Sequence, residues 1–264
     1  MHNFNYHRPA SVADAVKALS AASDGKILAG GHTLLPTMKQ RLAAPSDLID
    51  ISAIAELKGI KAEGNNLVIG ATTPHAEVAR SSAVKSAIPA LAVLAEGIGD
   101  AAVRNRGTIG GSISNNDPAA DYPAALVGLG ATVQTNKRKI AADDFFKGLF
   151  ETALEPGEIV TSVSFPKAEK AGYAKFPNPA SRYAMVGVFV AKTGGGVRVA
   201  VTGAGPSVFR VKEMEQALSS KWSADAVAAV KVPAKGLNSD IHGSADYRAH
   251  LITVMAKRAV AAAG

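Results

Sequence analysis

The residues best suited to bind a ligand lie in two glycine-rich segments. The first, residues 29–36, reads AGGHTLLP, and the second, residues 104–112, reads RNRGTIGGS. Glycines let a backbone approach a bulky ligand closely and adopt torsion angles closed to other residues. Consecutive amides in such turns, with the hydroxyls of Thr33, Thr108 and Ser112, suit the two negative charges of a pyrophosphate. We therefore expect a dinucleotide to be held between two subdomains.

A short acidic segment follows the second glycine-rich segment. It reads NNDPAADYP over residues 115–123, with Asp117 and Asp121 on either side of Pro118. Aspartates beside proline commonly form turns or begin helices. Next to a nucleotide, a carboxylate can instead accept hydrogen bonds from ribose hydroxyls, as in dinucleotide-binding folds. Both interpretations stay open for Asp121. His32 likewise either shapes the first turn or contacts the cofactor.

Other kinds of site have weaker signals. Residues 203–208, GAGPSV, begin like a Rossmann fingerprint but end in valine where glycine is needed, and Pro206 lacks an amide. We therefore expect a structural turn there. The sequence has no P-loop, no GxSxG motif and no metal-ligand spacing among its six histidines. Without cysteine, it has no disulfide and no thiolate ligand for an iron–sulfur cluster.

The net charge of +7 raises the question of nucleic-acid binding. The only dense basic cluster, Lys137-Arg138-Lys139, follows a strand-like segment, and aromatic residues are only 5% of the chain. We therefore expect a solvated hairpin turn there and no nucleic acid; docking to an acidic partner explains the charge equally well. Apolar stretches such as 184–191 are too short to span a bilayer, and a secretory signal is lacking. The sequence predicts a cytoplasmic protein, with the inner face of the membrane as a further location.

The elements that would position these segments follow from apolar patterns and helix signals. Ser11 is suited to cap a helix that Gly25 would stop, and residues 26–29 read as a strand that leads into the first glycine-rich segment. Further strands are expected at 48–51, 67–71, 131–135 and 159–165. Helices are expected at 87–98, interrupted early by Pro89, and at 124–129, with a loop at 99–107.

The last hundred residues or so have a different pattern. A lysine-rich stretch, residues 166–175, reads as a linker. Strands at 183–192 and 197–202 are joined by TGGG, which is a hairpin signal. Three helices are expected after them, at 211–218, 224–230 and 246–262.

Several of these segments occur in an order that identifies a family. The motifs AGGHTLLPTMK, LIDI, IGATT, RNRGTIGGS and NDPAADYP follow one another along the chain. In this the chain resembles the FAD-binding medium subunit of the molybdenum hydroxylases, the carbon monoxide dehydrogenase and xanthine dehydrogenase family. The resemblance implies an α+β protein: a two-subdomain FAD-binding fold of the PCMH type, residues 1–55 and 56–166, followed by a smaller α+β C-terminal domain, residues 167–264.

The resemblance also implies the residues that bind FAD. Residues 29–33 and 108–112 would hold the pyrophosphate, Asp121 would bind ribityl or ribose hydroxyls, and Val103 would line the flavin channel. Tyr183 would pack on the flavin ring. Ser112 stands where many relatives have asparagine; serine keeps a hydrogen-bond donor there but has a shorter reach. The full predicted set is Leu28, Ala29, Gly30, Gly31, His32, Thr33, Leu34, Ala101, Val103, Thr108, Gly110, Gly111, Ser112, Asn115, Asp121 and Tyr183.

For function, the resemblance implies an electron-transfer subunit with no catalytic residue or metal site of its own. Electrons would leave a molybdenum-cofactor large subunit, cross the [2Fe-2S] clusters of a small subunit and reach FAD in this chain. An external acceptor such as a quinone or NAD would then reoxidise the flavin. A dimer of heterotrimers is expected. Two alternatives stay open: a stand-alone FAD-dependent oxidase or reductase of the same fold, and a binding or assembly protein without enzymatic activity.

Overall fold

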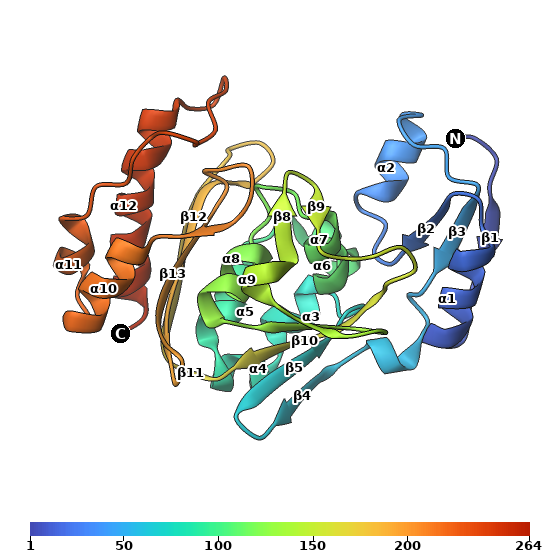
Figure 1. Cartoon of the computed structure of the whole chain (residues 1–264), viewed down its shortest axis with the longest axis horizontal. Coiled ribbons are helices and arrows are strands. Elements are labelled where there is room, and N and C mark those ends of the chain that lie inside the picture. Colours follow the sequence, from blue (N-terminus) through green and yellow to red (C-terminus); the bar gives the residue numbers. More distant parts are fainter.

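The computed structural model describes residues 1–264, which form three larger sheets with their helices along the long axis of the molecule, and a two-stranded sheet of β8 (Phe146–Gly148) and β9 (Glu151–Thr152) (Figure 1). The N-terminal unit lies at one end, the largest sheet lies in the middle, and the C-terminal helices lie at the other end (Figure 1). No helix combines the length and the apolar character needed to cross a bilayer.

The N-terminal unit is a small parallel sheet with one helix packed on it. Its strands are β1 (Asn5–His7), β2 (Gly25–Leu28) and β3 (Asp47–Asp50), in the order β1-β3-β2. Helix α1 (Val12–Ala21) begins where predicted, because the Ser11 hydroxyl accepts a hydrogen bond from the amide of Asp14 at 3.1 Å. Helix α2 (Leu34–Lys39) begins within the first glycine-rich segment. Strand β1 was not predicted, because three partly exposed residues carry no strand pattern.

The central sheet is antiparallel and has the order β4-β5-β10-β6-β7. Three of its strands were predicted, and β4 and β7 lie at its edges. Strand β10 in the middle pairs with both β5 and β6. The short helix η1 (Ala55–Leu57) leads into this sheet. The strands are β4 (Ile60–Glu63), β5 (Asn66–Gly70), β6 (Thr132–Thr135), β7 (Lys139–Ala141) and β10 (Val160–Pro166).

Helices of the central unit fill the space between its sheet and the C-terminal sheet. Every residue of α8 (Tyr122–Leu129) is buried, as its apolar sequence predicted. The helix expected over 87–98 is α5 (Pro89–Glu96), which begins at Pro89 because proline is favoured in the first turn of a helix, and the separate helix α4 (Ser82–Ala87) before it was not predicted. The other elements are α3 (His75–Arg80), α7 (Ile109–Asn115) and α9 (Ala142–Phe145).

The loop predicted over 99–107 is wrong. Most of it is helix α6 (Ala101–Arg106), whose start is capped by the Asp100 carboxylate, which accepts a hydrogen bond from the amide of Val103 at 2.9 Å. The helix buries no residue fully, so it has no apolar stripe that a sequence pattern could reveal.

The linker predicted over 166–175 is also wrong, because this stretch belongs to strand β11 (Ala168–Pro177). It pairs along its length with β12 (Ala184–Thr193), in a sheet completed by β13 (Gly196–Thr202) and β14 (Phe209–Arg210). Strand β11 lies at the edge of this sheet, where lysines are common because they discourage pairing with other chains. The predicted hairpin between β12 and β13 is confirmed.

Strand β12 is buried on both faces because helices cover both sides of its sheet. Val186, Val188 and Val190 face the C-terminal helices, whereas Phe189 and Ala191 belong to the core of the central unit. On the C-terminal side the covering helices are α10 (Lys212–Ser220), α11 (Ala224–Ala228) and α12 (Ala245–Ala262), all predicted, and on the other side they are α5 and α8. The C-terminal sheet therefore packs directly on the unit that carries the second glycine-rich segment.

Candidate functional site

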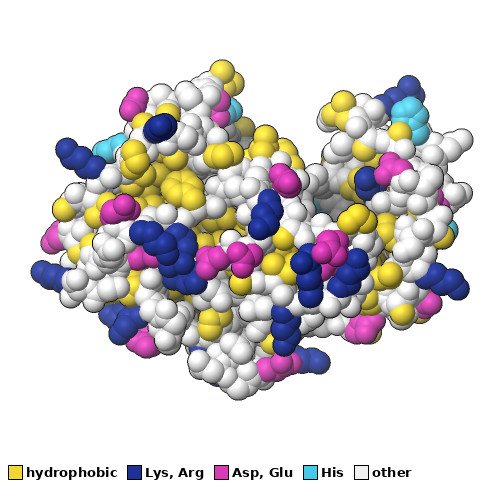
Figure 2. Space-filling model, in the orientation of Figure 1, with side chains coloured by type: hydrophobic (Ala, Val, Ile, Leu, Met, Phe, Trp, Pro, Cys, Tyr) yellow, Lys and Arg dark blue, Asp and Glu magenta, His cyan; other side chains and the backbone are white.

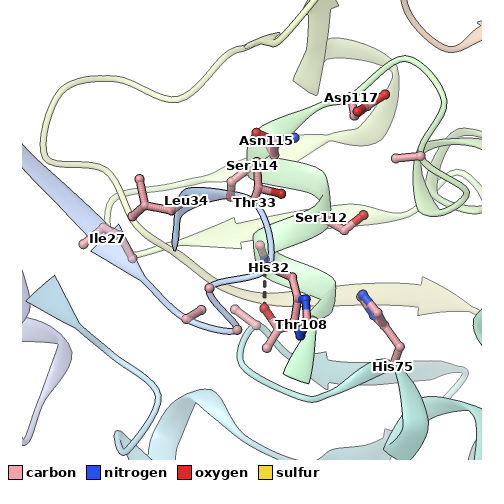
Figure 3. A pocket seen from close by; sticks show the side chains of 18 of the residues that line it. Ile27, His32, Thr33, Leu34, His75, Thr108, Ser112, Ser114, Asn115 and Asp117 are labelled. Carbon is pink, nitrogen blue, oxygen red and sulfur yellow. Dashed lines mark hydrogen bonds between the residues drawn. The ribbon is translucent and has the colours of Figure 1, made fainter. Parts of the chain in front are cut away.

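The two glycine-rich segments meet at one pocket of about 650 Å³, lined by 33 residues. The surface is hollowed between the N-terminal lobe and the rest of the molecule (Figure 2), and residues from both sides point into the pocket (Figure 3). A cavity thus lies where the sequence predicted a ligand between two subdomains. The volume of this cavity is within the usual range for small-molecule sites.

The first segment connects β2 to α2 as a loop with free backbone donors. Gly31 has a φ of 76°, which side chains other than glycine rarely adopt. A Cβ on Gly30 would collide with the carbonyl of Arg106, so the two glycine-rich segments also pack against each other. None of the amides of residues 30–34 donates a hydrogen bond within the chain. Because strong donors are normally paired, these amides are suited to an anionic ligand.

The second segment was predicted to be a turn throughout. The structure shows a short turn that leads into helix α7. The Thr108 hydroxyl caps this helix by accepting a hydrogen bond from the amide of Gly111 at 3.1 Å. The amide of Gly110 donates to the carbonyl of Ala71 at 2.8 Å, and a Cβ at Gly110 would meet Ala71 at 2.7 Å. Gly110 is therefore needed for close packing of α7 on the end of β5, next to the pocket.

Asp121 stands at the N-cap position of α8, but its side chain does not cap that helix. Its carboxylate accepts a hydrogen bond from the Tyr173 hydroxyl at 2.6 Å and forms an ion pair with the Lys175 ammonium at 2.9 Å. Both partners belong to β11. Burial raises the pKa of Asp121, although the Lys175 charge and the Tyr173 hydrogen bond oppose the shift. Asp121 thus joins the wall of the pocket to the C-terminal sheet.

Two family models together cover almost the whole chain. The model described as FAD binding domain in molybdopterin dehydrogenase matches residues 2–168, and the one described as CO dehydrogenase flavoprotein C-terminal domain matches residues 171–263. The chain belongs to the FAD-binding medium subunits of the molybdenum hydroxylases. It is an oxidoreductase subunit, and its cofactor is FAD.

Individual members of this family are similar over their full length. The medium chain of carbon monoxide dehydrogenase from Hydrogenophaga pseudoflava is 39% identical, with 98% of this chain and 96% of that protein covered. The nicotine 6-hydroxylase medium subunit from Paenarthrobacter nicotinovorans is 37% identical over the same shares. A solved carbon monoxide dehydrogenase from Hydrogenophaga pseudoflava superposes with a TM-score of 0.88 at 40% identity, covering 99% of this chain and 97% of that chain.

All but one of the residues predicted to bind FAD line this one pocket. The exception is Ala101, which begins α6 and whose neighbours Gly99 and Val103 line the pocket in its place. Tyr183 is 47% exposed, in a loop held by the Asn178 side chain, which accepts from the amides of Ala180 and Ser181 at 2.9 and 3.1 Å. The predicted residues that line the pocket are Leu28, Ala29, Gly30, Gly31, His32, Thr33, Leu34, Val103, Thr108, Gly110, Gly111, Ser112, Asn115, Asp121 and Tyr183.

The pocket has further lining residues that sequence reasoning missed. Lys26 comes from β2, before the first glycine-rich segment, and Ser181 and Arg182 come from the loop before β12. Two more, His75 and Glu158, are buried titratable residues. The only signal for His75 in the sequence was its place shortly after a buried strand. Its closeness to the second glycine-rich segment arises in the fold and could not be read from the sequence. Glu158 gave no signal of its own.

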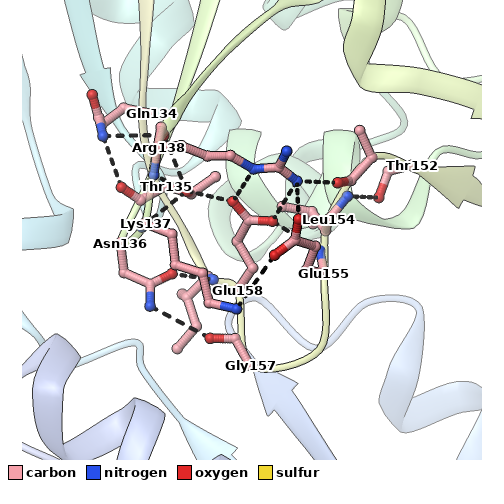
Figure 4. A network of polar contacts seen from close by, with 12 residues as sticks. Gln134, Thr135, Asn136, Lys137, Arg138, Thr152, Leu154, Glu155, Gly157 and Glu158 are labelled. Atoms are coloured by element: carbon pink, nitrogen blue, oxygen red, sulfur yellow. Dashed lines mark hydrogen bonds and ion pairs between the residues drawn. The ribbon is translucent and has the colours of Figure 1, made fainter.

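Glu158 is held by the basic cluster that was expected to be a solvated turn (Figure 4). The hairpin between β6 and β7 is present, but Arg138 donates to both carboxylate oxygens of Glu158 at 3.0 and 3.1 Å. Thr135 and the amide of Glu155 add hydrogen bonds at 2.7 and 2.8 Å. These contacts, Arg138 first, lower the pKa of Glu158 to about 2. Arg138 thereby fixes the loop that leads into β10 and lines the pocket.

Replacing Arg138 with methionine is expected to destabilise the fold, because the buried Glu158 carboxylate then loses the guanidinium that donates to both of its oxygens. The folded pKa of Glu158, about 2, lies below its ordinary value of 4.5, so the pair stabilises the fold above pH 4.5. That stabilisation is lost as the pH falls from 4.5 toward 2. Urea unfolding at neutral pH and near pH 4 measures both effects. Lys139→Met, an exposed neighbour, is the control, and an equal loss there would contradict the assignment.

The imidazole of His75 is expected to stay neutral at physiological pH. Burial, with smaller contributions from His32 and Arg104, lowers its pKa from 6.5 to about 4. Between these two values the unfolded chain binds the proton and the folded chain does not. The fold therefore loses roughly 3 kcal/mol as the pH falls through this window. A proton NMR titration of the ring measures the pKa, and a midpoint near 6.5 would exclude a buried neutral ring.

Proposed function

We propose that this chain carries electrons through FAD, bound in the pocket between the two glycine-rich segments, from an iron–sulfur partner to an external acceptor. The observation that carries the proposal is the set of unpaired donors around that pocket. The backbone amides of residues 30–34 have no partner in the chain, and the side chains of Ser112 and Asn115 on the facing helix have none. A pyrophosphate between a loop and a helix would satisfy donors from both sides.

The chain's own residues would bind and orient the flavin nucleotide. We assign the pyrophosphate to the amides of the first glycine-rich segment, together with Thr33 and Ser112. We assign the nucleotide hydroxyls to Asp121, whose second carboxylate oxygen has no protein partner while the first is held by Tyr173 and Lys175. Leu28 and Val103 supply apolar wall, and Tyr183 stands on the loop at the pocket's edge. Ala101 is left out of this assignment.

When bound, FAD supplies a centre that accepts electrons in pairs and releases them to a second partner. We propose that the electrons come from a molybdenum-cofactor large subunit through a [2Fe-2S] small subunit, in a dimer of heterotrimers. The relatives' names support this proposal, because they are described as medium chains or medium subunits. One similar solved structure is described by the state of its molybdenum cofactor. We further propose three units, residues 1–55, 56–166 and 167–264, with the electron acceptor reaching the flavin from outside the chain.

The flavin proposal is tested by loading. The purified chain is expected to carry one FAD, not FMN, because two glycine-rich segments around one pocket match a pyrophosphate. The cofactor should also be released by acid, since the chain has no cysteine for a thioether bond and His32 lies on the segment assigned to the phosphates, away from the flavin ring. Acid precipitation followed by chromatography of the supernatant identifies the nucleotide. Recovery of FMN, or yellow colour that stays in the protein pellet, would contradict the proposal.

The partner proposal is tested by activity and by composition. The isolated, flavin-loaded chain is expected to give no substrate-dependent reduction of a dye with carbon monoxide, purines or aldehydes. The assembly purified through this chain should contain two further subunits together with molybdenum and iron. Dye reduction by the metal-free single chain would favour a stand-alone oxidase instead.

A further inference from the structure

His75 is the one buried histidine of the pocket wall, and its position is fixed by the second glycine-rich segment. It begins α3, and its amide donates to the carbonyl of Gly107 at 3.0 Å. Pro74, just before it, forms a bridge with Thr108. The imidazole extends from the start of α3 toward Thr108 and Ser112 (Figure 3). The ring is thus held beside the residues assigned to FAD.

The two ring nitrogens of His75 have different surroundings. Nδ1 is fully buried and has no hydrogen-bond partner. The same holds for the hydroxyl of Tyr122, whose ring centroid lies 5.3 Å from the centroid of the His75 ring. Nε2 lies on the opposite edge, against Gly107 of the pocket wall. A Cβ on Gly107 would come within 2.6 Å of this nitrogen, so only glycine leaves room for the ring there.

These surroundings decide where the proton of the neutral ring lies. A buried N–H without an acceptor is rarer and more costly than a bare acceptor nitrogen, so the proton is disfavoured on Nδ1. It therefore resides on Nε2, at the pocket. The side chain is only 4% exposed, and no group of the chain accepts a hydrogen bond from it. The pocket wall thus presents an uncharged N–H donor whose acceptor must come from a ligand.

We propose that His75 binds the cofactor by donating a hydrogen bond from Nε2 to an acceptor oxygen of bound FAD. The inference rests on the proposed function and adds a residue to the binding site. The acceptor oxygen belongs either to a phosphate or to the flavin ring. In both cases the chemistry is the same: a neutral donor, fixed by Gly107 on one side and by the Tyr122 ring on the other.

The experiment compares two variants in the full-length apoprotein by titration with FAD. His75→Gln can place an amide N–H near the position of Nε2, whereas His75→Leu keeps bulk without a donor. We expect the leucine variant to bind FAD about tenfold more weakly and the glutamine variant to stay within about threefold of the wild type. Titrations with ADP and with riboflavin locate the acceptor, since a phosphate contact weakens ADP binding and a flavin contact weakens riboflavin binding.

Two results would overturn the proposal: wild-type affinity in the leucine variant, or equal losses in both variants, which would indicate packing alone. Failure of the wild type itself to bind FAD would instead refute the proposed function. If the variants do not fold, ¹⁵N NMR of the wild type with FAD still decides. A proton on Nε2, with a shift of its resonance on FAD binding, supports the proposal. A proton on Nδ1, or an Nε2 resonance that FAD leaves unchanged, overturns it.

Discussion

Gly31→Val is expected to abolish FAD loading while leaving a folded protein. Gly31 has a φ of 76°, and a Cβ there would lie 2.8 Å from the side chain of Leu35. A β-branched residue at this torsion costs about 1–3 kcal/mol, and the strain is relieved by moving the loop. Movement would turn the unpaired amides of residues 30–34 away from the pocket. We expect FAD affinity to fall by at least about a hundredfold, because strain and lost amide contacts add, so that the purified variant carries no flavin.

The matched control is Gly236→Val. Gly236 has a similar φ of 86° and open space around its Cα, and it lies in the C-terminal region outside the pocket. Flavin content per folded chain, measured by absorbance, and thermal unfolding separate binding from stability. The control should lose stability at most and keep its FAD. Full flavin content in Gly31→Val would mean that the first glycine-rich segment is an ordinary structural loop.

The elements that sequence predicted well have signals contained in a few adjacent residues. Strand β5 is a buried apolar run, α8 is apolar all round, and the hairpin between β12 and β13 carries glycines at its turn. The first glycine-rich segment also behaved as predicted, because a positive φ and a close backbone contact both require glycine. For these parts, local chemistry and the final fold agree.

The wrong predictions of secondary structure have one physical cause: in each case contacts with other parts of the chain determine which element forms. Strand β11 reads as a linker because its lysines are visible in the local sequence, whereas its pairing with β12 depends on residues elsewhere in the chain. Helix α6 depends on the cap from Asp100. Gly110 and Gly111 were interpreted as a turn, but Thr108 caps a helix at that point and β5 packs beside it. Local patterns do not encode these partners.

The candidate site divides in the same way. The backbone donors of the pocket come from glycine motifs and were visible in the sequence. The buried groups behind them were not, because each is assembled from elements distant in sequence. Glu158 depends on Arg138 from the turn between β6 and β7, and Asp121 depends on Tyr173 and Lys175 from the C-terminal sheet. A carboxylate that reads as a helix cap thus becomes the link between the pocket and a different domain.

Lys175→Met is expected to be among the most destabilising single changes in the chain. Lys175 pairs with Asp121 and also donates to the carbonyl of Gly97 at 2.8 Å, so its ammonium joins β11 to two parts of the central unit. Removing one partner of a buried ion pair costs roughly 3–5 kcal/mol, because the remaining charge has neither water nor a counterion. Asp121 then lowers this cost by taking up a proton, since burial already raises its pKa.

This protonation gives the variant a characteristic pH dependence. When the folded pKa of an acid lies above its unfolded value, folding binds a proton and stability falls as the pH rises through the folded pKa. The deficit of Lys175→Met relative to the wild type should therefore be largest at alkaline pH and smaller in mild acid. Thermal unfolding of both proteins across this range measures it. A deficit that does not change with pH would mean that Asp121 is not the group left unpaired.

The double variant Asp121→Asn, Lys175→Met separates the two roles of Asp121. It has no buried charge, and its amide oxygen can still accept the hydrogen bond from Tyr173, so we expect it to recover much of the lost stability and to lose the pH dependence. If the carboxylate also binds hydroxyls of FAD, affinity for FAD should stay below the wild-type value even though the fold is restored. The carboxylate makes charge-assisted hydrogen bonds that an amide makes more weakly. Full recovery of both properties would assign Asp121 a purely structural role between the pocket and β11.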